Sequence, residues 1–406
     1  MVRNFIHFCS DSFKYSLSGK NLYHVWMGTL TFFMIVGAFF YSKQVTHGLV
    51  VTGMNDYVSW GLYISNFTFL VGLAAAAVML VLPAYIFSDK DFHNIVLIGE
   101  GVAVGALLMC LAFVTADMGG PERAWHLLPG IGYFNWPESM LAWDVLVLNG
   151  YLALNLFVPM YILFQRWQGK TPNKKVYLPF VFLSIFWAFG IHLVTAFLYA
   201  GLPARPFWNN ALLGPRFLAS AFAGGPAFIL LLLGVVKKFS NFKVDAQIKS
   251  KLALIITVAA QINLIMLGSE IFKEFYTPTE HSISAFYLFF GVGEHNALVP
   301  WIWTSITLNI IATVTLTIHK FRSNPKFLYP SCVILFIAIW IDKGMGLVIP
   351  GFIPSPLGEF VEYQPTLVEV AVSLGIWAFG LFVLSVLVRL GFAIEQGYLR
   401  KNQNSN

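Results

Sequence analysis

Long apolar segments alternate with short polar ones along the whole chain. A helix that crosses about 30 Å of hydrocarbon needs roughly 20 apolar residues. Segments of this length recur throughout, and the stretches between them contain charged residues, Pro and Gly. The pattern predicts an all-α integral membrane protein of about ten transmembrane helices, at residues 22–41, 57–87, 94–116, 143–165, 177–200, 216–236, 252–271, 297–318, 327–349 and 367–393.

Two segments differ from a simple span. Residues 57–87 form an apolar run longer than the bilayer requires, so the second span is expected to tilt or to extend past the lipid. Residues 280–296 are apolar but short, and we interpret them as a re-entrant or interfacial segment, with an eleventh span as the alternative. No internal repeat or linker divides the sequence, so residues 1–406 are expected to form a single polytopic membrane domain.

Composition supports a membrane protein and excludes a soluble one. Of the residues, 58% are hydrophobic and only 11% are charged, whereas soluble domains carry roughly a quarter charged residues. The net charge of +6 does not predict nucleic-acid binding, because the basic residues lie in short clusters between apolar runs. The three cysteines are scattered, which predicts neither a disulfide framework nor a metal site, and no cleavable signal peptide is evident.

Basic residues predict the orientation. If both termini are cytoplasmic, 19 of the 25 Lys and Arg residues fall on the cytoplasmic side and six on the outer side. Such an excess is typical of cytoplasmic loops. We therefore expect a multi-pass protein of the cytoplasmic (inner) membrane, surrounded by lipid, with an even number of spans.

Acidic residues show the opposite bias, since thirteen of nineteen fall at or near the outer face. Acids contribute little to insertion, so a docking surface or a proton-handling site would explain the bias. The alternative is that the outer loops are simply longer and more polar.

The densest group of ionisable side chains lies where the third span ends and the fourth begins. Asp117, Arg123 and His126 follow the third span, and Trp143 and Asp144 open the fourth. Quinone chemistry needs a donor for each carbonyl, a base for each quinol hydroxyl and a flat apolar slot for the ring. The alternative is that Arg123 pairs with Asp117 to hold the loop and that Trp143 is an interfacial anchor.

Depth adds two residues of the second span to this group. Tyr63 and Asn66 lie two or three turns below the outer end and, being three residues apart, share a helix face. The predicted quinone site therefore comprises Tyr63, Asn66, Asp117, Arg123, His126 and Trp143. Because Asp117 would be paired with Arg123, His126 is the better base near neutral pH.

Other ionisable residues at membrane depth are candidates for proton transfer, because burying them in lipid is costly. His192 lies about two-thirds of the way across the fifth span, and Glu100 lies near the cytoplasmic end of the third. Asp144 and Glu270, at the outer ends of their spans, complete the candidate set. The alternative for His192 is a hydrogen bond to a neighbouring helix.

Metal and haem sites are not expected. Membrane cytochromes hold haem between paired His residues on facing helices, and here only His24 and His192 lie inside spans, towards opposite ends. No Cys cluster could hold an iron–sulfur cluster. If the protein does redox work, its electrons must come from or go to a partner.

Several motifs resemble those of one family. The stretch TADMGGPERAWHLL…NWPESMLAW at 115–143 is similar to the D-x-G-R-P-x-R…S-x-x-S-W pattern of NrfD/polysulfide-reductase-type membrane subunits, with Gly120 in place of the first Arg of that pattern. WGLYISNFTFLVGLAAAA at 60–77 resembles another helix of the family. IHLVTAFLYAGLPARPFW, PRFLASAFAGG and IDKGMGLVIPGFIPSPLGE resemble its ten-span branch, in particular the DsrP-type subunits of dissimilatory sulfur metabolism.

This resemblance implies a quinone-binding subunit of a respiratory electron-transfer complex, built from two four-helix bundles plus peripheral helices. It would exchange electrons between menaquinol or menaquinone and a ferredoxin-like iron–sulfur subunit at the outer face. A multihaem cytochrome c and further membrane and cytoplasmic redox subunits would be its other partners. The alternatives are another NrfD-type complex, such as a hydrogenase, a secondary transporter, or a passive anchor for other subunits.

Overall fold

The computed structural model describes residues 2–87, 89, 92, 95–128, 130–239, 245–276 and 279–401, and this part of the chain is helical apart from turns and irregular connections. It contains ten helices that are long and apolar enough to cross a membrane, which confirms the predicted fold class. They are α2 (Asn21–His47), α3 with its continuation (Leu62–Ile86), α6 (Val96–Asp117), α7 (Met140–Trp167), α8 (Lys174–Ala200), α9 (Leu213–Phe239), α10 (Ala246–Tyr276), α12 (Val299–Thr317), α14 with its continuation (Pro325–Phe352) and α16 (Leu367–Glu395).

The second span is shorter at its start and less regular than the sequence indicated. Residues 57–61 are not helical, and α3 itself runs Leu62–Ala74. The 3₁₀ turn η2 (Ala75–Ala77), the short α4 (Val78–Val81) and the π-helical turn η3 (Leu82–Ile86) continue it. Pro83 lies in η3, and its missing N–H and its ring are incompatible with a regular α-helical turn. The apolar run is longer than one regular helix for two reasons. Residues 57–61 precede the helix in a non-helical conformation, and residues 75–86 continue it as irregular helical turns.

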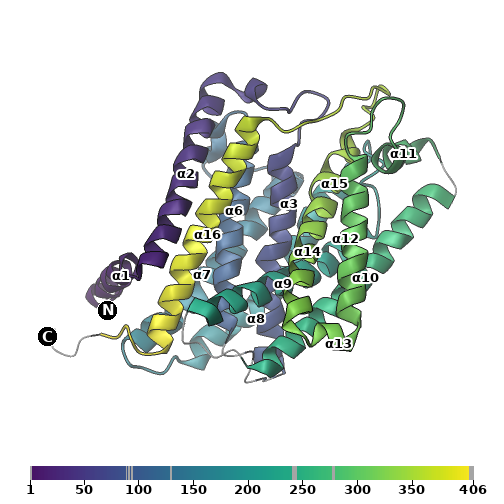
Figure 1. Cartoon of the computed structure of the whole chain (residues 1–406). Helices are drawn as coiled ribbons and strands as arrows, with labels where there is room; N and C mark the ends of the chain where they lie inside the picture. The colour runs from purple at the N-terminus through teal and green to yellow at the C-terminus, as the bar shows by residue number, and fades with distance from the viewer. Residues whose placement is uncertain are drawn as a thin grey trace.

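The segment at 280–296 does not form an eleventh span. It contains the 3₁₀ turn η5 (Glu280–Ser282) and α11 (Ile283–Phe290), followed by a turn closed by the β-bridge between Val292 and His295. Eight helical residues cover only about 12 Å, too little to cross the hydrocarbon. In Figure 1, α11 lies at one end of the molecule, beside the start of α12.

Eight of the spans form two bundles. α3, α6, α7 and α8 pack in a ring that we call the first bundle, and α9, α10, α12 and α14 form the second bundle. The bundles meet where α9 packs against α3 and α8. α2 and α16 pack against each other, and α16 covers α6 of the first bundle (Figure 1).

Small residues allow the closest helix crossings. A Cβ at Gly37 of α2 would lie 2.7 Å from Gly375 Cα of α16, and a Cβ at Gly225 of α9 would lie 2.4 Å from Ala76 Cβ. Within a membrane, helices associate through such close packing, because lipid tails are as apolar as the side chains. The first contact pairs the two peripheral spans, and the second joins the bundles.

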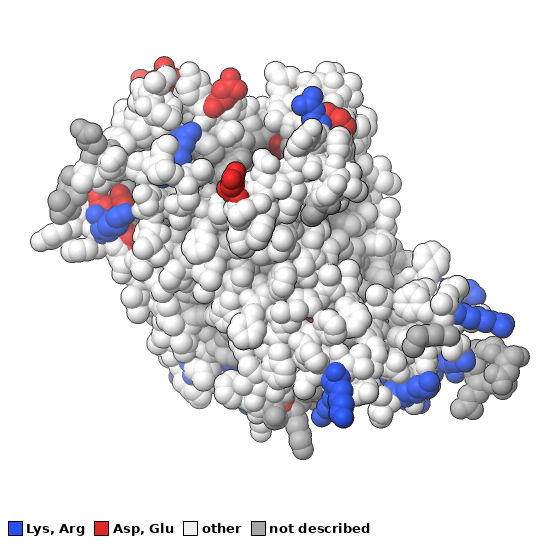
Figure 2. All heavy atoms as spheres, turned by 180° about the vertical axis from the view of Figure 1, so that it is seen from behind, with Lys and Arg blue, Asp and Glu red and all other residues white. Residues whose placement is uncertain are grey.

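The two ends of the helices differ in charge. Most acidic side chains visible in Figure 2 lie at its upper end, and Lys and Arg gather at its lower end. We call these the acid-rich end, where α3, α7, α9, α12 and α16 begin, and the base-rich end. The described chain begins with residue 2 and ends with residue 401 at the base-rich end (Figure 1), as an even number of spans requires.

One short helix lies at the base-rich end beyond the spans. α1 (Val2–Leu17) packs Phe8 against Phe164 and Trp167 of α7, with ring centroids 5.5 and 5.7 Å apart.

A strap of residues 353–366, between the turn η6 (Pro350–Phe352) and α16, runs over the acid-rich end. The remaining short elements are η1 (Leu49–Val51), η4 (Pro121–Leu127), α13 (His319–Arg322) and α15 (Met345–Val348).

Candidate functional site

Asp117 is the last residue of α6, at the acid-rich end. Its Oδ1 is buried and has no hydrogen-bond partner within the described parts of the chain. Directly beside it, Gln44 of α2 donates from Nε2 to the Ala116 carbonyl (2.6 Å) and accepts at Oε1 from the Tyr63 hydroxyl (2.7 Å). A buried carboxyl oxygen without a partner is costly. The turns of α2, α3 and α6 at this end therefore enclose an acceptor that a ligand hydroxyl could satisfy.

A second buried acid holds the same end together. Glu369, fully buried in the first turn of α16, accepts from the Gly53 and Thr366 backbone N–H groups (2.7 and 2.9 Å) and from the Tyr363 hydroxyl (2.5 Å). The Tyr363 oxygen in turn accepts from the Leu62 N–H (2.7 Å), which caps the start of α3. Burial and the Glu369 carboxylate raise the pKa of the Tyr363 hydroxyl, so this hydroxyl remains a donor.

Asn66 faces α14 and α16. Its Oδ1 accepts from the indole N–H of Trp340 (3.0 Å) and of Trp377 (2.9 Å), and its Nδ2 donates to the Leu62 carbonyl (2.8 Å). The amide oxygen therefore already accepts two hydrogen bonds, and one of the two Nδ2 hydrogens is used. The side chain joins three helices, and a ligand acceptor would have to reach the second Nδ2 hydrogen.

Two more predicted residues, Arg123 and His126, lie in the connection between α6 and α7. Arg123 is exposed, and its Nε lies 3.9 Å from Oε1 of Glu122. The expected pairing of Arg123 with Asp117 is therefore not formed. The His126 ring lies between Trp125 and Tyr133, with centroids 3.9 and 5.5 Å away. η4 turns the chain away from the end of α6, so these side chains are not brought onto the Asp117 carboxyl.

Trp143 lies at the start of α7 and is half-buried. Its indole N–H donates to the Pro137 carbonyl (2.8 Å), and its ring packs against Trp136 with centroids 5.1 Å apart. These contacts fix the end of the connection on α7. The rings of this region thus form two separate contacts, one of Trp125 and Tyr133 with His126 and one of Trp136 with Trp143.

Buried ionisable groups run through the first bundle. The Thr195 hydroxyl of α8 donates to Asp144 Oδ1 (2.9 Å), and both side chains are fully buried. One turn away, His192 Nδ1 lies 2.9 Å from the Ala188 carbonyl of its own helix, whereas Nε2 has no partner among the described residues. The expected alternative, a hydrogen bond from His192 to a neighbouring helix, is therefore wrong.

Glu100 lies near the base-rich end of α6. It is buried, and its Oε2 has no partner within the described residues. Like Asp144 and His192 it belongs to the first bundle, so three ionisable side chains are distributed along the length of that bundle.

The second bundle contains an ion cluster that most of the sequence signals did not reveal. Arg216 of α9 donates to Glu270 of α10 and to Asp342 Oδ1 of α14, the latter at 2.6 Å. All three side chains are largely buried. Of these residues only Glu270 was a candidate. Arg216 and Asp342 could have been found by the same rule, since both are charged residues at the ends of apolar runs.

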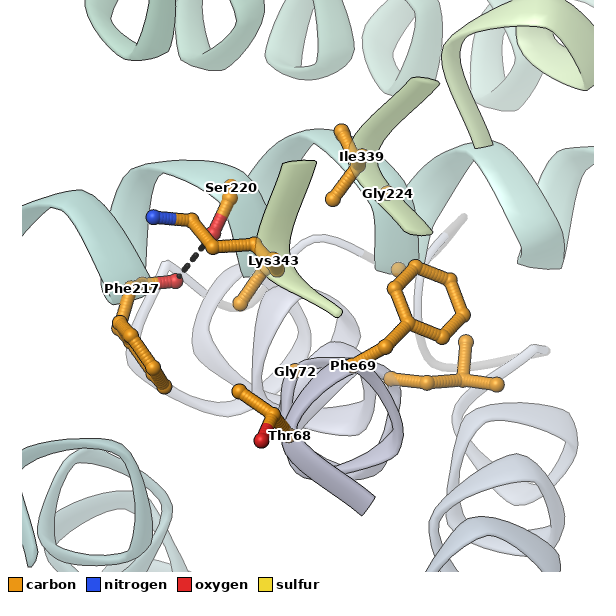
Figure 3. A pocket seen from close by; sticks show the side chains of 11 residues that line it. Thr68, Phe69, Gly72, Phe217, Ser220, Gly224, Ile339 and Lys343 are labelled. Atoms are coloured by element: carbon orange, nitrogen blue, oxygen red, sulfur yellow. Dashed lines mark hydrogen bonds between the residues drawn. The ribbon is translucent and has the colours of Figure 1, made fainter. Parts of the chain in front are cut away.

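Two pockets adjoin this cluster. The larger is partly open and is lined by the ion cluster together with apolar side chains, among them Phe207, Phe275 and Phe289. The smaller, also partly open, lies between α3, α9 and α14 (Figure 3). Lys343, the residue after Asp342, lines the smaller pocket. Among the described residues no group of three or more His, Cys, Asp and Glu could hold a metal ion.

Comparisons with known proteins agree with this architecture. Residues 50–351 match the profile of the family described as polysulphide reductase, NrfD. The chain is 27% identical to a selenate reductase component of Mesobacillus selenatarsenatis, covering 91% of this chain and 94% of that protein.

Two further relatives are named for quinone reactions. The chain is 22% identical to the Hdr-like menaquinol oxidoreductase integral membrane subunit of Archaeoglobus fulgidus, over 86% of this chain and 89% of that one. It is 26% identical to the menaquinone reductase integral membrane subunit of Nitratidesulfovibrio vulgaris, over 90% of each.

Proposed function

Because the chain belongs to the NrfD/polysulphide reductase family of membrane proteins, we propose that it is the quinone-binding membrane subunit of a respiratory electron-transfer complex. Two similar proteins are named menaquinol oxidoreductase and menaquinone reductase subunits, which supports menaquinol or menaquinone as the substrate. The chain itself holds no haem or iron–sulfur cluster in this proposal. Electrons pass between the quinone and a partner subunit.

The observation that carries the proposal is the buried Oδ1 of Asp117 at the acid-rich end, which has no partner among the described residues. A carboxylate can accept the proton of a quinol hydroxyl. The neighbouring Tyr63–Gln44 pair and the Phe113 ring, with its centroid 6.4 Å from that of Tyr63, offer a polar edge beside an apolar surface. This combination is typical of sites that bind a small aromatic ligand.

The connection between α6 and α7 supplies Arg123 and His126 to the proposed quinone site, and the neighbouring helices supply Trp143 and Asn66. His126 is the base that carries the proton away, since an imidazole can accept a proton near neutral pH. Trp143 contributes an aromatic wall, and Arg123 contributes a positive charge at the rim. Asn66 fixes the orientation of α3 against α14 and α16 through the indoles of Trp340 and Trp377. Both Arg123 and His126 reach the site in this proposal through movement of the exposed connection.

Protons then leave through buried groups of the spans. In the proposal Asp144 and His192 carry them within the first bundle, and Glu100 is the group nearest the base-rich end. Glu270, which contacts Arg216, is the proton-transfer group of the second bundle in this proposal. Each is an ionisable side chain within an apolar segment, which is uncommon without a function.

The acid-rich end is the docking face in this proposal. We assign it to the outside of the cytoplasmic membrane, with both termini in the cytoplasm, because 19 of 25 basic residues then lie inside. A ferredoxin-like iron–sulfur subunit would bind over the strap, with a multihaem cytochrome c and other redox subunits completing the complex. The motif resemblance favours a DsrP-type role in dissimilatory sulfur metabolism over other complexes of the family.

The first test is quinone binding and turnover by the purified complex. Asp117→Asn should slow quinol oxidation by about 10²-fold, the usual contribution of a proton-accepting group, while the complex still assembles. Asp56→Asn, which changes an exposed acid at the same end, is the control and should be neutral. Binding of a menaquinol analogue is measured in parallel. If the complex binds no quinone, or Asp117→Asn turns over at the normal rate, the proposal is wrong.

Orientation is tested separately with reporters fused after the last residue. A reporter that functions only in the cytoplasm should be active there, and one that functions only in the periplasm should be silent. The opposite result would reverse the assignment of the acid-rich end.

A further inference from the structure

α1 has an apolar stripe that no other described element covers. Val2, Ile6, Phe13 and Leu17 follow one another at spacings of 4, 7 and 4 residues, so they share one side of the helix. Their side chains are 61–74% exposed. Leaving such a row of large apolar side chains in water is unfavourable, which indicates that something covers it.

A basic row lies beside this stripe. Arg3, His7 and Lys14 each come one position after a residue of the stripe and are therefore about 100° further around the helix. All three are exposed, whereas Asp11, the one acid of α1, is half-buried. An apolar face flanked by exposed basic side chains is typical of helices that lie in the surface of a membrane.

A third side of α1 packs on the chain itself. Phe8 is buried against Phe164 and Trp167 in the last turn of α7, and Ile394 in the last turn of α16 belongs to the same cluster. Both of these turns are at the base-rich end. The middle of α1 is therefore held at the level where two spans end.

Arg389 of α16 holds the end of α1 at a similar level. Its guanidinium carbon lies 5.0 Å from the centroid of the Tyr15 ring and 4.1 Å from that of Tyr23, at the start of α2. Its Nη2 donates to the Ser18 hydroxyl (3.3 Å), between α1 and α2. Arg389 is six residues before the end of α16, or roughly 9 Å. Both contacts of α1 are thus with the last two turns of spans, and α1 lies beside the base-rich ends of α2 and α16 (Figure 1).

The stripe is continuous with a surface that faces lipid. Leu22, Val25 and Trp26, in the first turns of the span α2, are 44–65% exposed. Leu17, the last residue of the stripe, is five residues before Leu22. The stripe therefore adjoins side chains that already contact acyl chains, at an end of the molecule where Lys and Arg gather. Anionic phospholipid headgroups have the charge that complements this end.

We propose that α1 binds the membrane surface at the base-rich end, with the apolar stripe among the acyl chains and with Arg3 and Lys14 on the phosphates of anionic phospholipids. The long side chains of Arg3 and Lys14 can reach the headgroups while the helix stays at the boundary of the hydrocarbon. This lipid site is separate from the proposed quinone site, which lies at the acid-rich end.

The test uses the purified complex in vesicles of phosphatidylcholine and phosphatidylglycerol. A trace of a phospholipid with a photoreactive acyl chain is added, and the labelled residues are mapped by mass spectrometry of peptides. The stripe residues of α1 and the lipid-facing residues of α2 should be labelled. Arg3, His7 and Lys14 should not be labelled.

Two changes on the stripe test its insertion. Ile6→Asn together with Phe13→Asn should reduce labelling of Val2 and of Cys9, an exposed neighbour of the stripe, by roughly tenfold, because burial of two large apolar side chains is lost. Labelling of α2 should stay the same. His7→Asn, which places the same residue type on the basic row, is the matched control and should be labelled like the wild type.

A second pair of changes tests the choice of lipid. At low salt the phosphatidylglycerol form of the probe should label α1 about fivefold more than the phosphatidylcholine form, because an anionic headgroup is attracted to Lys and Arg. Arg3→Gln together with Lys14→Gln should abolish this preference, and so should high salt. Lys43→Gln, at an exposed lysine of the opposite end of α2, is the control and should leave the preference unchanged.

Three results would overturn the proposal. Labelling of α2 without labelling of α1 would mean that a partner subunit or water covers the stripe. Unchanged labelling of α1 in the Ile6 and Phe13 double variant would mean that the stripe does not insert. Equal labelling of the wild type by the two forms of the probe would exclude binding of anionic lipid, and this comparison decides the outcome if a variant fails to assemble.

Discussion

The two bundles bury ionisable side chains in different ways. In the first bundle the acids stand singly, and Asp144 has a threonine hydroxyl as its partner. In the second bundle Arg216 binds two carboxylates, from α10 and α14, in one cluster. A single acid in an apolar surrounding can become neutral by taking a proton, whereas a paired acid is held ionised by its partner. The first bundle is therefore suited to moving protons through separate groups. In the second bundle Glu270 can take part in proton transfer only if it leaves Arg216, and otherwise the cluster holds its charges at a helix junction.

Removing Arg216 should have the largest effect and tests the second bundle directly. Arg216→Met leaves Glu270 and Asp342 buried without this cation, and loss of one partner from a buried ion pair costs about 3–5 kcal/mol. The detergent-solubilised protein should melt well below the wild type and assemble poorly.

Adding Glu270→Gln and Asp342→Asn to Arg216→Met removes the unpaired charges and should recover most of the lost stability. Arg123→Met, at an exposed arginine 3.9 Å from Glu122, is the matched control and should change stability by less than about 1 kcal/mol. Equal destabilisation by the two arginine variants would mean that the cluster is not a fixed-charge junction.

His126→Ala addresses the acid-rich end of the first bundle. It should slow quinol oxidation by about 10²-fold or more, the contribution of a general base, without loss of stability, because the ring packs against Trp125 and Tyr133 of the same connection. Turnover of the assembled complex is the measurement. Glu359→Ala, at an exposed residue of the strap, should do little, and equal damage from both changes would misplace the site.

Asp144→Asn should have the smallest effect on stability. The asparagine oxygen can still accept from Thr195, so the shift in melting temperature should correspond to a change of about 1 kcal/mol or less. Proton-coupled turnover should nevertheless fall, because an amide cannot bind and release a proton. A large loss of stability would show that Asp144 holds the helices together through its contacts, like the acids of the second bundle, and the distinction between the bundles would disappear.

The candidate site shows where sequence reasoning stops. Asp117 and Tyr63 were selected from depth and residue type, and the structure does place them near one end of adjoining helices. Gln44, which joins α2 to the Tyr63 hydroxyl and to the Ala116 carbonyl, gave no signal, because a single glutamine in an apolar span does not reveal which helix it faces. Arg123 was expected to pair with Asp117 and so hold the loop, but η4 turns the chain away and leaves Arg123 in solvent.

The lengths of the apolar segments were enough to predict the spans and the even number of crossings. Hydrocarbon requires about 20 apolar residues per helix and forces the backbone groups to bond within their own helix, so this information is local in the chain. The identity of neighbouring helices is not local. Arg216 finds its partners 54 and 126 residues away, and Lys343 lines one pocket with Thr68 across the junction of the bundles. In lipid all outward faces are alike in polarity, so close packing of small residues and a few polar contacts select the arrangement, and neither has a periodicity that can be seen in one sequence.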